Sequence, residues 1–204
     1  MRFTAPPRFS VAEGVGSVRP LVLIPILVAL SVALTQPRSS AIEPDNRPEA
    51  LFTSVALVLQ QPRCLNCHPR GGDSPHQGTD AHTHKPLVVR GADDRGAPAM
   101  RCGTCHGSEN NTSSGIPGAP RWQLAPKSMG WEGLSQAELC RTLTDPEQNG
   151  NRDVAQLVEH MTTDPLVQWA WNPGAGRTPP PTSQSAFHKA VRLWASAGAP
   201  CPDE

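Results

Sequence analysis

Two short stretches of the sequence decide how the chain is interpreted: Cys64-Leu65-Asn66-Cys67-His68 and Cys102-Gly103-Thr104-Cys105-His106. Each has two cysteines separated by two residues and followed directly by a histidine. This spacing is typical of covalent haem attachment, in which the two sulfurs bond to the two vinyl groups of one haem and the histidine binds the iron. The sequence therefore predicts two haem c groups.

The pattern gives each of these residues a role. We expect Cys64 and Cys67 to form the thioether bonds of the first haem and His68 to be its proximal iron ligand. The corresponding residues of the second haem are Cys102, Cys105 and His106.

Three other kinds of site also use paired cysteines: a zinc ribbon, a redox dithiol and structural disulfides. The chain has 7 histidines among 204 residues. The chance that a histidine follows both of two given cysteine pairs is then about one in a thousand. A thioredoxin-like dithiol would also need a βαβ pattern, which the sequence lacks. Haem is therefore the favoured interpretation, with zinc as the main alternative.

Residues 1–41 have the features of a secretory signal. Arg2, Arg8 and Arg19 precede an apolar run at residues 21–34, and Ser39-Ser40-Ala41 follows it. This order of positive, apolar and small residues predicts cleavage near Ala41 and a periplasmic protein. The alternative is an uncleaved membrane anchor, but the run is shorter than the roughly 20 residues that span a bilayer. Contact with the membrane is expected only if the segment stays attached.

Residues 42–204 are then expected to form one di-haem cytochrome c domain. In this part of the chain Asp and Glu outnumber Lys and Arg, which disfavours a nucleic acid as partner. The chain has 23 prolines, 4% aromatic residues and no tyrosine, so a large side-chain core looks difficult to build. We therefore expect the haems to form much of the core.

The predicted fold class is mainly α with long irregular loops, in a cytochrome c-like arrangement. Helices are predicted from the Asp45-Asn46 cap toward Cys64, from the Ser135 capping box to Leu143, from Asp153 to Met161, and from Ser183 to Gly198. Residues 69–98 and 110–127 are rich in Gly, Pro and polar residues, so they are predicted to be loops. No convincing strand pattern is present.

Cys140 and Cys201 are the two cysteines outside the haem motifs. An even pair in an oxidising compartment predicts a disulfide. It would join the helix that opens at Ser135 to the end of the last helix. The alternative is two free thiols.

Each iron has a sixth coordination position, and the residue that fills it separates an electron carrier from a reactive haem. His84 is the candidate distal ligand in the loop between the motifs, with His82 as its competitor and plain solvent exposure as the alternative. His160 is the second candidate, because it lies at the flank of an apolar helical stripe. The other candidates are His76, His188, Met100, Met129 and Met161.

Beyond the motifs, most of the chain from Cys64 to Pro202 resembles a family of small exported two-haem cytochromes, often labelled as a subunit of isoquinoline 1-oxidoreductase. The stretches that carry the resemblance are Met100-Arg101-Cys102, 159–161, 164–166, 169–171, 173–174, 176–181 and 198–202. The resemblance implies that the protein accepts electrons from a molybdenum hydroxylase. It also favours His84 and His160 as distal ligands.

Two classes of function follow. In the first, both irons are six-coordinate and the protein passes electrons from a redox donor to a redox acceptor. In the second, one iron is five-coordinate and performs chemistry such as peroxide reduction, which needs a distal acid–base group. No sequence feature specifies such a group, so we expect an electron carrier and no catalytic residues.

Overall fold

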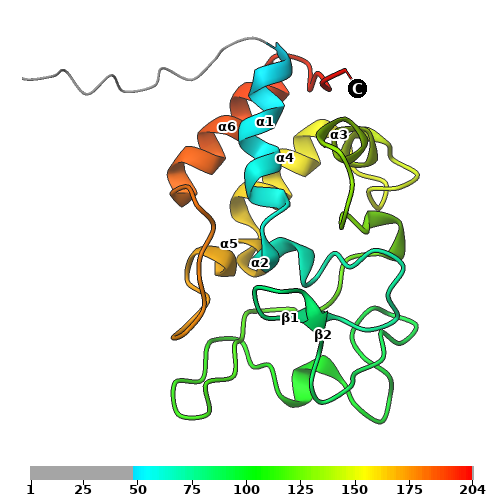
Figure 1. Cartoon of the computed structure of the whole chain (residues 1–204), viewed down its shortest axis with the longest axis vertical. Coiled ribbons are helices and arrows are strands. Elements are labelled where there is room, and N and C mark those ends of the chain that lie inside the picture. The colour runs from blue at the N-terminus through cyan, green and yellow to red at the C-terminus, as the bar shows by residue number, and fades with distance from the viewer. Residues whose placement is uncertain (1–47, 204) are drawn as a thin grey trace, which may run out of the picture. The chain divides into compact units, whose positions relative to one another are not determined.

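The computed structural model describes residues 48–203, so the predicted signal segment lies outside the described residues. Four longer helices lie together, and a loop-rich part contains both cysteine motifs (Figure 1). The longer helices are α1 (Pro48–Leu59), α3 (Gln136–Thr144), α4 (Val154–Thr163) and α6 (Gln184–Ser196). The shorter ones are α2 (Pro62–Leu65), α5 (Pro165–Gln168), and the 3-10 turns η1 (Cys102–Thr104), η2 (Lys127–Met129) and η3 (Trp169–Trp171).

Helices α3, α4 and α6 begin where the sequence predicts, while the predicted Asp45-Asn46 cap of α1 lies outside the described residues. Ser135 and Asp153 each accept a hydrogen bond from the backbone N–H three residues on, and the side chain at that position closes a capping box. Ser183 caps α6 in the same way, through Ala186 N–H. These predicted starts are confirmed, and α4 runs two residues beyond the predicted end at Met161.

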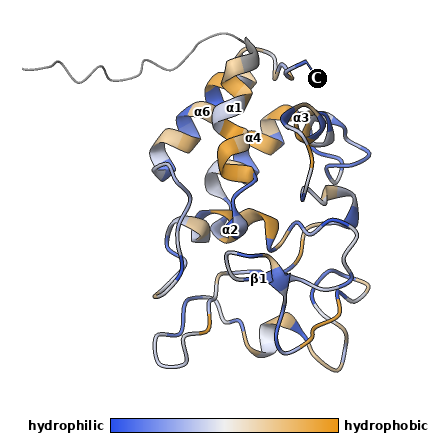
Figure 2. Cartoon of the chain, viewed as in Figure 1, coloured by the Kyte–Doolittle hydropathy of each residue, from blue (hydrophilic) through white to orange (hydrophobic). Residues whose placement is uncertain are grey.

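The helices enclose a packed side-chain core. Helix α6 packs against α1 and α4, and α1 also packs against α3. Figure 2 shows the apolar residues that α1 and α4 contribute. Side chains fully shielded from solvent include Phe52, Val55, Leu139, Val191 and Trp194. The composition alone therefore underestimates the core, because a few large residues at helical spacing suffice to build one.

The segment between the two motifs is irregular except for one small hairpin. Strands β1 (His76–Gln77) and β2 (His82–Thr83) pair antiparallel, a feature that the sequence analysis does not predict. Gly78 lies at the start of the turn with φ +80°, and its carbonyl oxygen accepts hydrogen bonds from Arg63 Nη2 (2.6 Å) and Asn66 Nδ2 (3.0 Å). The hairpin is thereby held against the first cysteine motif.

The structure joins Cys140 of α3 to Cys201 by a disulfide, with the sulfurs 2.02 Å apart. Cys140 is fully buried in the helical core. The link holds the chain beyond α6 against α3, the arrangement that the sequence predicts. Among residues 48–203, no helix combines the length and hydropathy needed to cross a bilayer.

Candidate functional site

The two cysteine motifs fold in the same way. In the first, the N–H groups of Cys67 and His68 both donate to the Cys64 carbonyl, over 3.1 and 3.0 Å. In the second, Cys105 and His106 donate to the Cys102 carbonyl over 3.2 and 2.9 Å. One helical turn puts positions i and i+4 on the same face. The first cysteine and the histidine of each motif therefore lie on one side of the turn.

Both motif histidines are oriented by a backbone carbonyl. His68 Nδ1 lies 2.8 Å from the Met129 oxygen, and His106 Nδ1 lies 2.7 Å from the Pro117 oxygen. A carbonyl oxygen only accepts, so Nδ1 must carry the proton in each ring. In the neutral imidazole this leaves the Nε2 lone pair to bind a metal. Metal-ligating histidines generally donate their other ring N–H in this way.

A tryptophan stacks on each of these imidazoles. The Trp131 indole lies on His68 with ring centroids 3.4 Å apart and planes 13° apart. The Trp122 indole lies on His106 with centroids 4.4 Å apart and planes 6° apart. The carbonyl fixes each ring at one nitrogen and the indole fixes its plane, so neither imidazole can rotate freely.

A glycine follows each carbonyl that accepts the histidine proton. A Cβ built on Gly130 would lie 2.8 Å from the Arg70 Cα, and one built on Gly118 would lie 2.6 Å from the Gly107 oxygen. Real Cβ atoms essentially never approach other atoms so closely, so only glycine lets the backbone pass here. Each close approach places the preceding carbonyl, that of Met129 or Pro117, within hydrogen-bond distance of its histidine.

The electrostatic surroundings keep both histidines neutral. Burial lowers the pKa of His68 to about 3, against the opposing effect of the Met129 hydrogen bond. Burial also lowers the pKa of His106. Near neutral pH both rings therefore keep the lone pair that a metal needs. Burial raises the pKa of the Cys64 thiol to about 12 and that of Cys67 to about 11, so these thiols are protonated in the polypeptide.

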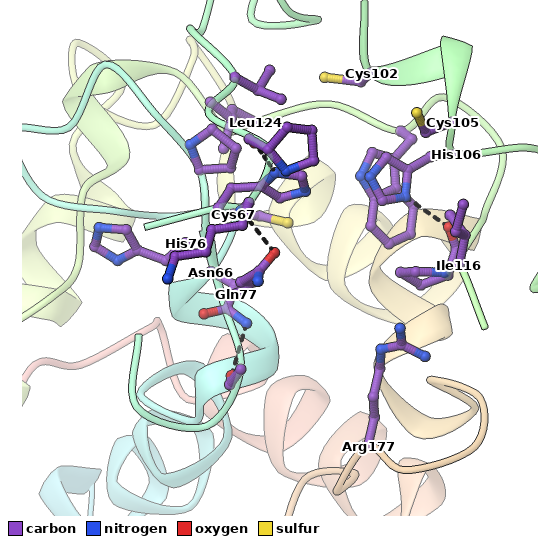
Figure 3. Close-up of a pocket in the computed structure, with 18 of the residues that line it drawn as sticks. Asn66, Cys67, His76, Gln77, Cys102, Cys105, His106, Ile116, Leu124 and Arg177 are labelled. Atoms are coloured by element: carbon purple, nitrogen blue, oxygen red, sulfur yellow. Dashed lines mark hydrogen bonds between the residues drawn. The ribbon is translucent and has the colours of Figure 1, made fainter. Parts of the chain in front are cut away.

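One cavity of about 570 Å³ brings parts of both motifs together. Cys67 from the first motif faces it together with Cys102, Cys105 and His106 from the second (Figure 3). Cys64 instead packs against the helical core. Much of the remaining lining is apolar. The loops contribute Val88, Ile116, Pro117, Trp122 and Leu124, and η3 contributes Trp169.

His84, the candidate distal ligand from the loop, lies across from His106 in this cavity. The two ring centroids are 6.0 Å apart, with planes at 66°. His84 Nδ1 lies 2.8 Å from the Pro86 carbonyl oxygen, so this ring also donates from Nδ1. His84 and His106 therefore both have Nε2 left for a metal.

His160, the other candidate, lies elsewhere. It lines a separate shallow cavity with Arg121 and Arg152, and its Nδ1 lies 3.4 Å from Asp164 Oδ2. His160 also contributes, after burial, to the lowered pKa of His68. Within residues 48–203, however, no ring contact joins His160 to His68.

The remaining candidates have other surroundings. His82 is exposed and its Nδ1 lies 2.5 Å from Asp80 Oδ1, while His188 Nε2 lies 2.8 Å from Gln168 Oε1. Met129 and Met161 are buried in the helical core. His76 and Met100 both line the large cavity. His76 Nδ1 is buried and has no hydrogen-bond partner. The Met100 side chain is 40% exposed.

The four motif cysteines are free thiols in the polypeptide. Over the described part of the chain, no three His, Cys, Asp or Glu side chains converge in a group that could hold a metal ion by themselves. A comparison of the chain with protein families, curated proteins and solved structures finds no match. The relationship to two-haem cytochromes therefore stays a prediction from the motifs.

Sequence reasoning missed four residues of this site: Gly118, Trp122, Gly130 and Trp131. A pattern for them exists. In Met129-Gly130-Trp131 the tryptophan directly follows the glycine, and in the other set Trp122 follows Gly118 by four residues. Each set serves one motif, so the same arrangement occurs twice in the structure, at different spacings in the sequence.

Proposed function

We propose that this protein is a periplasmic electron carrier with two covalently attached c-type haems. The observation that carries the proposal is the shared geometry of His68 and His106. Both follow a Cys-x-x-Cys turn, both donate Nδ1–H to a carbonyl and both stack on an indole. A disulfide gives no reason for this repeated arrangement, whereas a haem iron needs an oriented Nε2 beside the two sulfurs.

The residues of the large cavity fit a haem. The cavity combines the second motif's two thiols with an apolar lining, as a flat and mostly apolar group requires.

The chain's own residues do the work of orientation. The iron of a haem supplies one-electron oxidation and reduction. The carbonyls of Met129 and Pro117 fix the tautomer of the proximal histidines and raise their basicity. Trp131 and Trp122 hold the ring planes. A rigid ligand environment limits rearrangement when the charge of a site changes, which suits electron transfer.

His84 favours the carrier over the haem enzyme at the second site. Two imidazoles that bind one metal from opposite sides have ring centres about 6 Å apart, given metal–nitrogen distances of about 2.0 Å. The centroids of His84 and His106 are 6.0 Å apart. If His84 and His106 both bound one iron, that iron would have no open position for peroxide. At the first site, His160 is the proposed distal ligand from the sequence alone.

The partners follow from the same proposal. An electron carrier needs a redox donor and a redox acceptor, and the resemblance of the sequence makes a molybdenum hydroxylase the proposed donor. Neither a nucleic acid nor a membrane surface is required.

The first experiment is an optical spectrum of the purified protein, oxidised and reduced, with a pyridine haemochrome count and addition of carbon monoxide. We expect two c-type haems per chain, both low-spin and neither binding the gas. A Cys102→Ser, Cys105→Ser variant should keep one haem, while the matched control Cys140→Ala, Cys201→Ala should keep two. A high-spin or gas-binding haem would favour the enzyme, and a protein without haem would refute the proposal.

A further inference from the structure

The cavity shared by the two motifs has an unbalanced charge. Four cationic side chains line it, and none of its described lining residues is an Asp or Glu. The four are Arg63, Lys85, Arg101 and Arg177. Asp93 neutralises Arg101 from outside the lining, through bonds of 2.8 and 2.6 Å. Neither Arg63 nor Arg177 has a carboxylate partner among the side chains of residues 50–203.

Arg63 is buried to 6% exposure, where an unpaired charge is costly. Its Nη2 donates to the Gly78 carbonyl over 2.6 Å, but its Nε is buried without a hydrogen-bond partner. A guanidinium that lines a cavity and whose described hydrogen-bond partner is a neutral carbonyl can bind an anion there.

Arg177 comes from the irregular segment that precedes α6 and reaches the same cavity. Its Nη1 and Nη2 donate to the carbonyls of Pro173 (3.3 Å) and Gly115 (2.7 Å). Figure 3 shows the side chain extending toward His106 and Ile116. The two guanidinium groups also interact electrostatically: burial lowers the pKa of Arg63, and the positive charge of Arg177 lowers it further. Two neighbouring like charges with neutral partners favour an anion between or beside them.

We propose that Arg63 and Arg177 form a carboxylate-binding pair and that the group they bind is a propionate of a haem. This inference rests on the proposed function. The pair offsets the negative charge that the propionates introduce, and it keeps them ionised. Both effects act on the redox properties of the haem, because a nearby positive charge favours the reduced iron over the oxidised iron.

The test uses the full-length, haem-loaded protein and the variants Arg177→Gln, Arg177→Lys and Arg63→Gln. Arg192→Gln, an exposed arginine on α6 outside the cavity, is the matched control. Midpoint potentials are measured from mildly acidic to mildly alkaline pH, and the haems of each variant are counted by pyridine haemochrome. Infrared difference spectra between the oxidised and reduced protein report the propionate carboxylates directly.

We expect Arg177→Gln to lower one midpoint potential by about 59 mV, a tenfold change in the ratio of oxidised to reduced haem for a one-electron couple. The potential should also become more dependent on pH, because the propionate then titrates closer to neutrality. Arg177→Lys should keep most of the wild-type behaviour, and Arg192→Gln all of it. Arg63→Gln should act in the same direction as Arg177→Gln.

Three results would overturn the inference in distinguishable ways. Two haems with unchanged potentials and carboxylate bands in Arg177→Gln would refute the pair and leave the proposed function intact. A wild-type potential that shifts with added acetate, and does so only while Arg177 is present, would assign the pair to a free carboxylate. A wild-type protein without haem would remove both the inference and the proposed function.

Discussion

His84 and His106 come from loops on either side of the second cysteine pair, and their ring centroids lie 6.0 Å apart. Each ring is bonded through Nδ1 to a backbone carbonyl, that of Pro86 or Pro117. The two rings thus share the tautomer that leaves Nε2 for a metal. The hydrogen bond of His84 spans two residues and that of His106 spans eleven, and both acceptors lie in loops.

This pairing predicts the effect of His84→Ala. Both haems should remain attached, because attachment depends on the cysteines. The second haem should lose one axial ligand, become high-spin and bind carbon monoxide in the reduced state. Optical and electron paramagnetic resonance spectra, together with a haem count, measure this change.

His82→Ala is the control for that experiment. His82 also lines the cavity, but its Nδ1 contacts Asp80 and its ring is exposed. This variant should keep both haems low-spin. If His82→Ala gave the high-spin haem and His84→Ala did not, the two loop histidines would exchange roles.

His160→Ala tests the sequence-based ligand of the first haem. We expect both haems to stay attached and a coordination position to open at the first iron, seen as carbon monoxide binding. His188→Ala is the matched control, since it is also a helical histidine with a polar partner, Gln168. Unchanged low-spin spectra in His160→Ala would refute this assignment. His160 would then serve only as the partner of Asp164.

Local features of this fold could be predicted from the sequence, and long-range ones could not. The capping box at Ser135 and the turn at each cysteine motif depend on neighbours a few residues away. The carbonyls that accept the histidine protons lie farther away in the sequence. Met129 is 61 residues from His68, and Pro117 is 11 residues from His106. No periodicity identifies such partners. The hairpin at Gly78 was also missed, because its strands are two residues long.

The glycines that follow these acceptors give a further prediction. Gly118→Ala places a Cβ 2.6 Å from the Gly107 oxygen, and Gly130→Ala places one 2.8 Å from the Arg70 Cα. Overpacking of this kind costs about 1–3 kcal/mol of unfolding free energy. Because the carbonyl moves with the glycine, each variant should also change the spectrum of its own haem and spare the other. Denaturant unfolding and resonance Raman spectra measure both effects.

Gly103→Ala is the control for these variants. Gly103 lies within the second motif, but a Cβ there meets no atom within 4 Å. Its stability and spectra should match those of the wild type. A Gly118→Ala protein that behaves like Gly103→Ala would show that the carbonyl of Pro117 does not need the close approach.

The Cys140–Cys201 disulfide should supply a large share of the stability of the helical part. It links residues 61 apart in sequence, and closing a loop of that length contributes about 4 kcal/mol by restricting the unfolded chain. Cys140→Ala, Cys201→Ala should therefore lower the free energy of unfolding by about this amount while both haems stay attached.

Cys140 is fully buried, so alanine also removes packing there. The wild-type protein treated with a thiol reductant keeps both sulfurs and isolates the loss of the link, provided that the haem irons are reduced in every sample. Equal denaturation midpoints for the treated and untreated protein would show that the bond contributes no stability.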